Sequence, residues 1–156
     1  MSAIVREVVY AHSSERVWRA LTDPQELGAW LMPNDFVPTV GHKFQFNVGP
    51  RLGWRGIVDC EVLEVDPPRR LVQSFRALWG EEVKSEGTSR VTWEIEPVGD
   101  SCLLKVTHDQ LREAANSQLY GGWPMILSGI KTLLETGEML TTPGSLRWSK
   151  APESVV

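Results

Sequence analysis

Residues 89–111 read SRVTWEIEPVGDSCLLKVTHDQL, and this stretch decides the fold class. Apolar and polar residues alternate on both sides of Gly99-Asp100, a dipeptide that is typical of tight hairpin turns. A period of two places alternate side chains of a strand on one face of a sheet. That face carries Val91, Trp93, Ile95, Cys102, Leu104, Val106 and His108. The stretch therefore predicts two antiparallel strands whose apolar face needs a covering element.

The segments before this hairpin predict further strands. Residues 3–10 are rich in Val and Ile, which favour strands, and Phe44 and Phe46 alternate with polar residues in HKFQFNV. In WRGIVDCEVLEV the apolar set changes parity at Val62 and Leu63, which predicts a β-bulge there. The expected strands cover residues 3–10, 42–48, 54–65 and 71–78, with a turn at Asp66-Pro67-Pro68 between the last two.

Two short helices are expected between the first two of these strands. Ser13 or Ser14 is a suitable N-cap before a segment with helical spacing of apolar residues. Asp23 ends that helix, because Pro24 follows it, and Pro24 itself fits the first turn of a second helix. The second helix is expected to stop before Pro33.

The segment WPMILSGIKTLLETGEML predicts a long amphipathic helix near the C-terminus. Trp123, Leu127, Ile130 and Leu134 fall at helical intervals and form one apolar stripe. Pro124 is compatible with a helix only in the first turn, so the helix is expected to begin near Trp123 and to run for eighteen residues. Its stripe is the expected cover for the apolar face of the sheet.

Composition limits the classes of function. The chain has 156 residues, and its 16 Lys and Arg against 20 Asp and Glu give a formal net charge of −4. Nucleic-acid and anionic-membrane binding both require a positive field, so neither is expected. The early charges Arg6 and Glu7 argue against a signal peptide, and no apolar stretch has the length of a membrane span. A cytoplasmic location is expected, with one domain over residues 1–140 and a loosely ordered tail over 141–156 that contains Trp148.

Catalytic and metal-binding motifs are missing from the sequence. It contains no G-x-S-x-G, H-E-x-x-H or phosphate-binding glycine motif. His12, His42 and His108 lie far apart, and Cys60 and Cys102 have no C-x-x-C partner. Both cysteines lie on apolar strand faces and are expected to be buried and inert. We therefore assign no catalytic residue, no metal site and no cofactor from the sequence.

Four stretches, taken in order, resemble the START-like helix-grip superfamily (SRPBCC), which has the fold of the birch pollen allergen. The stretches are SSERVWRALTD, RGIVDCEVLEVDPPRRLV, SRVTWEIEPVGDSCLLKVTHDQL and GWPMILSGIKTLLE, and together they span residues 5 to about 140. The resemblance is greatest to the branch of homologues of the heat-shock protein 90 ATPase activator. Ser13-Ser14 replaces the proline that usually precedes the first helix of this family, and Pro124 in the opening of the last helix is a second departure.

The resemblance implies an α+β helix-grip fold. A curved antiparallel sheet of about six strands would wrap on the long C-terminal helix, with two short helices after the first strand and a cavity between sheet and helix. Family members commonly bind apolar small molecules in that cavity. The seven tryptophans favour bulky walls, either of a packed core or of a cavity. The predicted cavity-lining residues are Trp30, Phe44, Phe46, Val58, Cys60, Phe75, Trp93, Ile95, Val106, His108, Trp123, Leu127 and Ile130.

His108 has two interpretations. It shares a strand face with Val106, so it is expected to point toward the helix-covered side, and the resemblance places a histidine here near the cavity rim. There it would donate a hydrogen bond or a proton to a ligand. Alternatively it is a structural histidine bonded to a backbone carbonyl. An inward-pointing Arg55, Arg76 or Arg90 would instead indicate an anionic ligand, because a buried guanidinium needs an anion.

Three functions remain open at this point. The first is a carrier, sensor or sequestering protein that binds a small apolar or aromatic molecule. The second is a cyclase- or hydrolase-like enzyme that uses polar groups of the cavity such as His108. The third is a co-chaperone-like stimulator of a chaperone ATPase. The corresponding partners are a small hydrophobic ligand, a second copy of the chain and a chaperone, and the first function is the preferred hypothesis.

Overall fold

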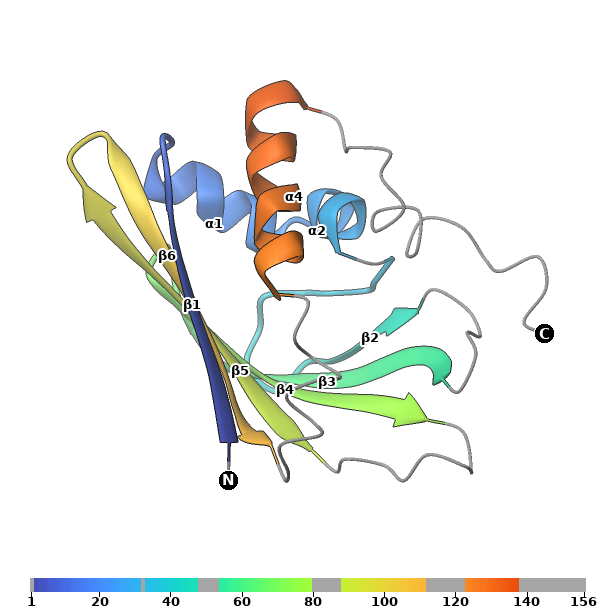
Figure 1. Ribbon diagram of the computed structural model, residues 1–156. Helices are drawn as coiled ribbons and strands as arrows, with labels where there is room; N and C mark the ends of the chain where they lie inside the picture. The colour runs from blue at the N-terminus through green and yellow to red at the C-terminus, as the bar shows by residue number, and fades with distance from the viewer. Residues whose placement is uncertain (1, 32, 48–53, 80–87, 112–122, 138–156) are drawn as a thin grey trace.

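Six strands form one sheet in the part of the chain that the computed structural model describes, residues 2–31, 33–47, 54–79, 88–111 and 123–137. All neighbouring strands are antiparallel, in the order β1-β6-β5-β4-β3-β2 (Figure 1). The strands are β1 (Ser2–Tyr10), β2 (Lys43–Asn47), β3 (Trp54–Asp66), β4 (Arg70–Trp79), β5 (Ser89–Val98) and β6 (Ser101–Leu111). The helices are α1 (Ser14–Thr22), α2 (Pro24–Trp30) and α4 (Trp123–Thr136). The expected α+β fold is confirmed.

The β5–β6 hairpin forms in the register that the alternation predicts. Val91 lies opposite His108, and Trp93 lies opposite Val106. Gly99 adopts a φ of 61°, a left-handed conformation that suits a tight turn and that glycine adopts without steric cost. The alternate residues Val91, Trp93, Ile95, Cys102, Leu104, Val106 and His108 are all buried.

The predicted bulge lies in β3. Val62 is opposite Gln73 and Glu64 is opposite Val72, so Leu63 is an extra residue without a partner across the pair. The bulge keeps Val62 buried and leaves Leu63 exposed. The extra residue thus accounts for the change of parity in the apolar pattern of this strand.

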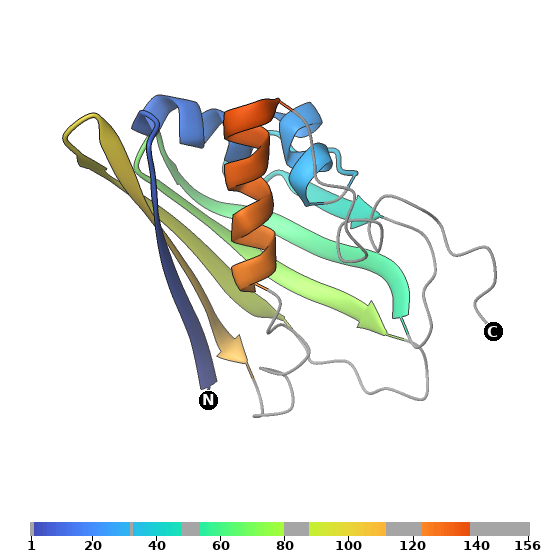
Figure 2. The same cartoon turned by 45° about the horizontal axis from the view of Figure 1, so that its top comes forward.

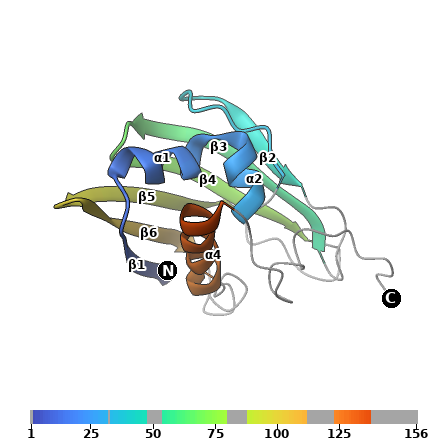
Figure 3. The same ribbon diagram turned by 90° about the horizontal axis from the view of Figure 1, so that it is seen from above.

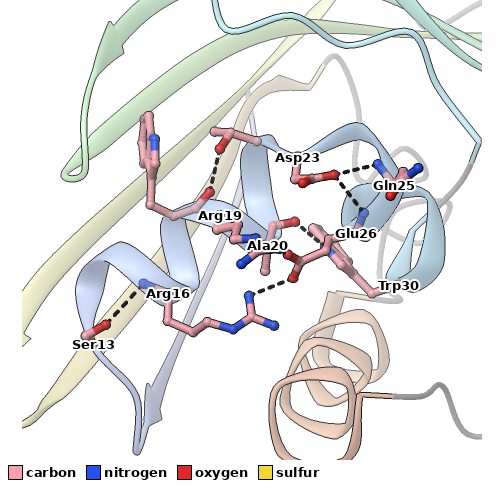
Figure 4. Close-up of polar contacts among 10 residues, drawn as sticks. Ser13, Arg16, Arg19, Ala20, Asp23, Gln25, Glu26 and Trp30 are labelled. Atoms are coloured by element: carbon pink, nitrogen blue, oxygen red, sulfur yellow. Dashed lines mark hydrogen bonds and ion pairs between the residues drawn. The ribbon is translucent and has the colours of Figure 1, made fainter.

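The helices α1 and α2 form one compact corner (Figure 4). The Ser13 side chain accepts a hydrogen bond from the Arg16 N–H and caps α1, as expected. Asp23 caps α2 by accepting from the Gln25 and Glu26 amides, while its own N–H bonds back to α1. A single residue thus ends one helix and begins the next. The Glu26 carboxylate pairs with Arg16 at 2.6 Å and with a second arginine of α1 at 2.7 Å.

The helix α4 lies along the concave side of the curved sheet, together with α1 and α2 (Figures 2 and 3). The Tyr10 hydroxyl donates a hydrogen bond of 2.8 Å to the Leu127 carbonyl and ties α4 to β1. The helix begins at Trp123 as expected but ends at Thr136, so the expected run of eighteen residues is wrong. Gly137 adopts a φ of 76°, and its N–H bonds to the Leu133 carbonyl. This left-handed glycine ends the helix.

The expected C-terminal tail cannot be compared with the structure. Residues 138–156, including Trp148 and the expected tail, lie outside the described residues. Among the helices that are described, none is long and apolar enough to cross a membrane.

Candidate ligand-binding site

The predicted cavity residues come together on the concave side. Nine of them come from the sheet, one from α2 and two from α4. These are Phe44, Phe46, Val58, Cys60, Phe75, Trp93, Ile95, Val106 and His108, then Trp30, then Leu127 and Ile130, and all are buried. The Trp123 side chain lies outside the described part of the chain. Burial on one face agrees with both a packed core and a lined cavity, so the lining assignment stays a prediction.

Two groups of aromatic rings can be distinguished among the buried residues that the structure describes. Trp30 of α2 packs edge-on against Trp93 of β5, with ring centroids 5.8 Å apart and planes at 84°. The Trp30 Nε1–H donates to the Ala20 carbonyl at 2.7 Å, so this buried indole has a hydrogen-bond partner. The second group is formed by Phe36, Phe44 and Phe46, whose successive centroids lie 5.0 and 5.5 Å apart. Both groups present large apolar surface to the concave side.

His108 is fully buried, and its expected place near a cavity rim stays a prediction. Its Nε2 lies 2.7 Å from the Ser89 Oγ, and its ring packs edge-on against Phe75 at 5.1 Å. A serine hydroxyl is thus one partner of this ring. Ser89 begins β5 and lies one row away from His108 on the same face, so the sheet register brings the two side chains together.

The Phe75 carbonyl determines where the protons lie between His108 and Ser89. The Ser89 hydroxyl also contacts the Phe75 carbonyl at 2.9 Å, and a carbonyl can only accept. Ser89 therefore donates to Phe75, and His108 donates its Nε2–H to Ser89. Burial lowers the pKa of His108 to about 4, with a smaller opposing effect of Asp109, so the ring is neutral near pH 7.

Gln73 is the polar residue that sequence reasoning missed. It lies on the inward face of β4 between Leu71 and Phe75, and only 5% of its surface is exposed. Its Nε2 donates to the Cys60 Sγ at 3.8 Å, a contact with a weak acceptor. The alternation in LVQSF placed a glutamine on the apolar face, and this was the available signal.

Of the three predicted arginines, the two whose side chains are described, Arg76 and Arg90, do not point inward. Arg90 pairs with Asp109 on the convex side at 2.7 Å, and Arg76 is exposed. The Arg55 side chain lies outside the described part of the chain. Cys60 and Cys102 are buried free thiols, as expected, and burial raises the pKa of both. Among the described residues, no group of His, Cys, Asp and Glu is arranged to hold a metal ion.

Two depressions lie on the outer surface. The larger, of about 660 Å³, runs across β2, β3 and β4, and its lining mixes acidic groups with Lys43 and Arg76. It touches Phe44 and Cys60 of the predicted set but is otherwise polar. The smaller, of about 400 Å³, lies where the N-terminus of α1 meets the turns after β3 and β5. Apart from Phe44 and Cys60 in the larger depression, neither is lined by the residues that the sequence predicts for the ligand site.

Comparison with known proteins gives a family and a fold. Residues 11–135 match the model of the family described as Activator of Hsp90 ATPase homolog 1-like protein. No curated protein matches the chain. Among solved structures, protein MLL2253 from Mesorhizobium loti is 31% identical, with a TM-score of 0.75 over 88% of this chain and 100% of that one.

Two more distant structures share the fold. CalU16 from Micromonospora echinospora is 23% identical, with a TM-score of 0.71 over 94% of this chain and 81% of its own. The Aha1 dimer from Colwellia psychrerythraea is 21% identical, with a TM-score of 0.69 over 88% and 98%.

Proposed function

Because the chain belongs to the Activator of Hsp90 ATPase homolog 1-like protein family, we propose that it binds a small apolar or aromatic molecule between the sheet and α4. The fold of this family is that of ligand-binding and polyketide cyclase-like domains. The observation that carries the proposal is the concave face itself, which combines two aromatic groups with a covering amphipathic helix. We propose that the thirteen predicted residues line the site.

The helix α4 lies where the proposed site needs a cover. Its closest backbone neighbours in the described chain are α2, β1 and α1, which lie around it, rather than the middle strands beneath it. Side chains fill the layer between a helix and a sheet in a packed core, and a ligand fills part of it in a binding site, so this placement is compatible with the proposed site. The Tyr10–Leu127 hydrogen bond joins α4 to β1 at one edge of the sheet.

A binding role is favoured over catalysis by the geometry at His108. A histidine that activates a serine must accept the hydroxyl proton. Here the Ser89 proton points to the Phe75 carbonyl, and His108 is the donor in its contact with Ser89. This arrangement positions the imidazole and does not prepare it as a general base.

Further partners and boundaries are proposed on comparison alone. A second copy of the chain is one candidate, since a dimer of Aha1 from Colwellia psychrerythraea shares the fold. A chaperone is another, since the family takes its description from an Hsp90 ATPase activator. A single ligand-binding domain over residues 1–140 and a cytoplasmic location belong to the same proposal.

A thermal-shift experiment with a matched pair of variants tests the binding site. Val91 is fully buried at the middle of the concave face, whereas Val98, on the same strand, is 51% exposed. Neutral aromatic compounds should raise the melting temperature of the wild type and of Val98→Phe. Val91→Phe fills the proposed site, so the same compounds should leave its melting temperature unchanged.

Circular dichroism shows whether Val91→Phe retains the fold. Equal shifts for the two variants would place the ligand elsewhere. No shift of the wild type with any neutral aromatic compound would contradict the proposed function.

A further inference from the structure

We infer that Gln73 is the recognition point for a neutral aromatic ligand that carries a hydroxyl or carbonyl group. The inference rests on the proposed function and names the chemical class that the site would take. It begins from a polar side chain whose hydrogen-bonding capacity is largely unused.

The Gln73 side-chain amide makes few hydrogen bonds for a buried group. A side-chain amide offers two N–H donors and a carbonyl acceptor. Only 5% of the residue is exposed, and the Cys60 Sγ at 3.8 Å is the hydrogen-bond partner that the described residues supply. The Gln73 Oε1 is not one of the fully buried atoms without a partner, so it stays within reach of a small molecule. Burying an amide without strong partners destabilises a fold, and leucine would fill the same place without that penalty. A bound molecule that completes the hydrogen bonds explains why a glutamine is compatible with this position.

The sheet register places Gln73 on the floor of the proposed site. Gln73 lies opposite Val91, and Val91 lies opposite His108, so the three side chains form one row across β4, β5 and β6. Adjacent strands are about 4.8 Å apart, which puts the two polar ends of the row roughly 10 Å from each other. Val91 is the apolar residue between them. A flat ring over Val91 would reach the Gln73 amide with a substituent at its edge.

The chemistry of the row selects a neutral ligand. His108 is neutral near pH 7 and already donates its Nε2–H to Ser89, while the buried Cys60 thiol stays protonated. Arg76 and Arg90 lie on the other side of the sheet. Among the described residues no cation faces this row, so a carboxylate placed here would lose its hydration without gaining one of their charges as a partner, which is strongly unfavourable. A phenol, alcohol, ketone or amide would instead exchange hydrogen bonds with Gln73.

Three related compounds test this directly: 2-naphthol, naphthalene and 2-naphthoate. Calorimetric titration of the wild type should give a dissociation constant about tenfold lower for 2-naphthol than for naphthalene, as expected for one hydrogen bond. The affinity for 2-naphthoate should be weaker than for both. Gln73→Leu should bind 2-naphthol and naphthalene equally. The control Gln45→Leu removes an exposed glutamine that bonds Asp59, and it should keep the wild-type preference.

A second readout does not depend on a variant. The side-chain amide resonances of Gln73 in a nitrogen–proton correlation spectrum should shift on addition of 2-naphthol and much less on addition of naphthalene. Unshifted amide resonances would overturn the inference, and so would an unchanged preference for 2-naphthol in Gln73→Leu. If the amide holds only a water molecule, Gln73→Leu should become more stable without losing the preference, and this result would also overturn the inference. Failure of all three compounds to bind the wild type would count against the proposed function itself.

Discussion

At the scale of single residues, the buried His108 shows where sequence reasoning reaches its limit. Alternation alone placed its side chain on the covered face, and the structure agrees. Its partner could not be predicted, because Ser89 lies 19 positions away and the contact depends on the pairing register. Gln73 was missed for another reason. An amide on an apolar face is neither aromatic nor titratable, so it has none of the usual sequence signs of a binding site.

His108 should make stability depend on pH. The pKa of this group falls from 6.5 to about 4 on folding, so between these values the unfolded chain binds a proton that the native state does not. The free energy of unfolding should therefore decrease as pH falls through this window, by up to roughly 3 kcal/mol from this group. Above pH 6.5 the stabilisation is fully present.

Urea denaturation at pH 7 and pH 5 measures this effect. The wild type should lose more stability between the two pH values than His108→Gln, which has no titrating group at this position. An equal loss in both proteins would show that His108 is not the source of the pH dependence.

At the scale of elements, periodicity was sufficient to predict the strands, both short helices and the bulge in β3. Each of these depends on local patterns, such as the parity change at Leu63 and the Asp23-Pro24 boundary. The end of α4 was predicted too late, although Gly137 is a typical helix-ending residue. The predicted segment included Met139 and Leu140, which lie beyond this glycine.

The hydrogen bond from Tyr10 should determine how firmly α4 is attached to the sheet. It joins a buried hydroxyl to the Leu127 carbonyl across 117 positions of sequence. Tyr10→Phe removes the donor and leaves that carbonyl without this partner, so it should lower the free energy of unfolding by about 1–2 kcal/mol. Amide exchange of α4 should accelerate more than exchange of β5.

Thr132→Val is the control, because the Thr132 hydroxyl bonds only within α4, to the Ser128 carbonyl. A Tyr10→Phe variant with unchanged stability and exchange would show that α4 is held by apolar packing alone.

At the scale of the whole molecule, the family and the fold direct attention to one face. The aromatic groups, the neutral His108–Ser89 pair and Gln73 all lie on the concave side, whereas Arg70 connects Glu64 and Glu94 on the convex side. A row such as Gln73, Val91 and His108 exists only once three strands are aligned. The sequence therefore predicted which face of the sheet carries the candidate site, but it could not predict which side chains meet there.

Native mass spectrometry of the purified protein tests the central claim, that a small molecule binds between the sheet and α4. The wild type and Val98→Phe should carry the same additional mass, which should be lost on denaturation and identify the ligand. Val91→Phe should have the mass of the chain alone. The same additional mass on Val91→Phe, or its absence from all three proteins, would contradict the account.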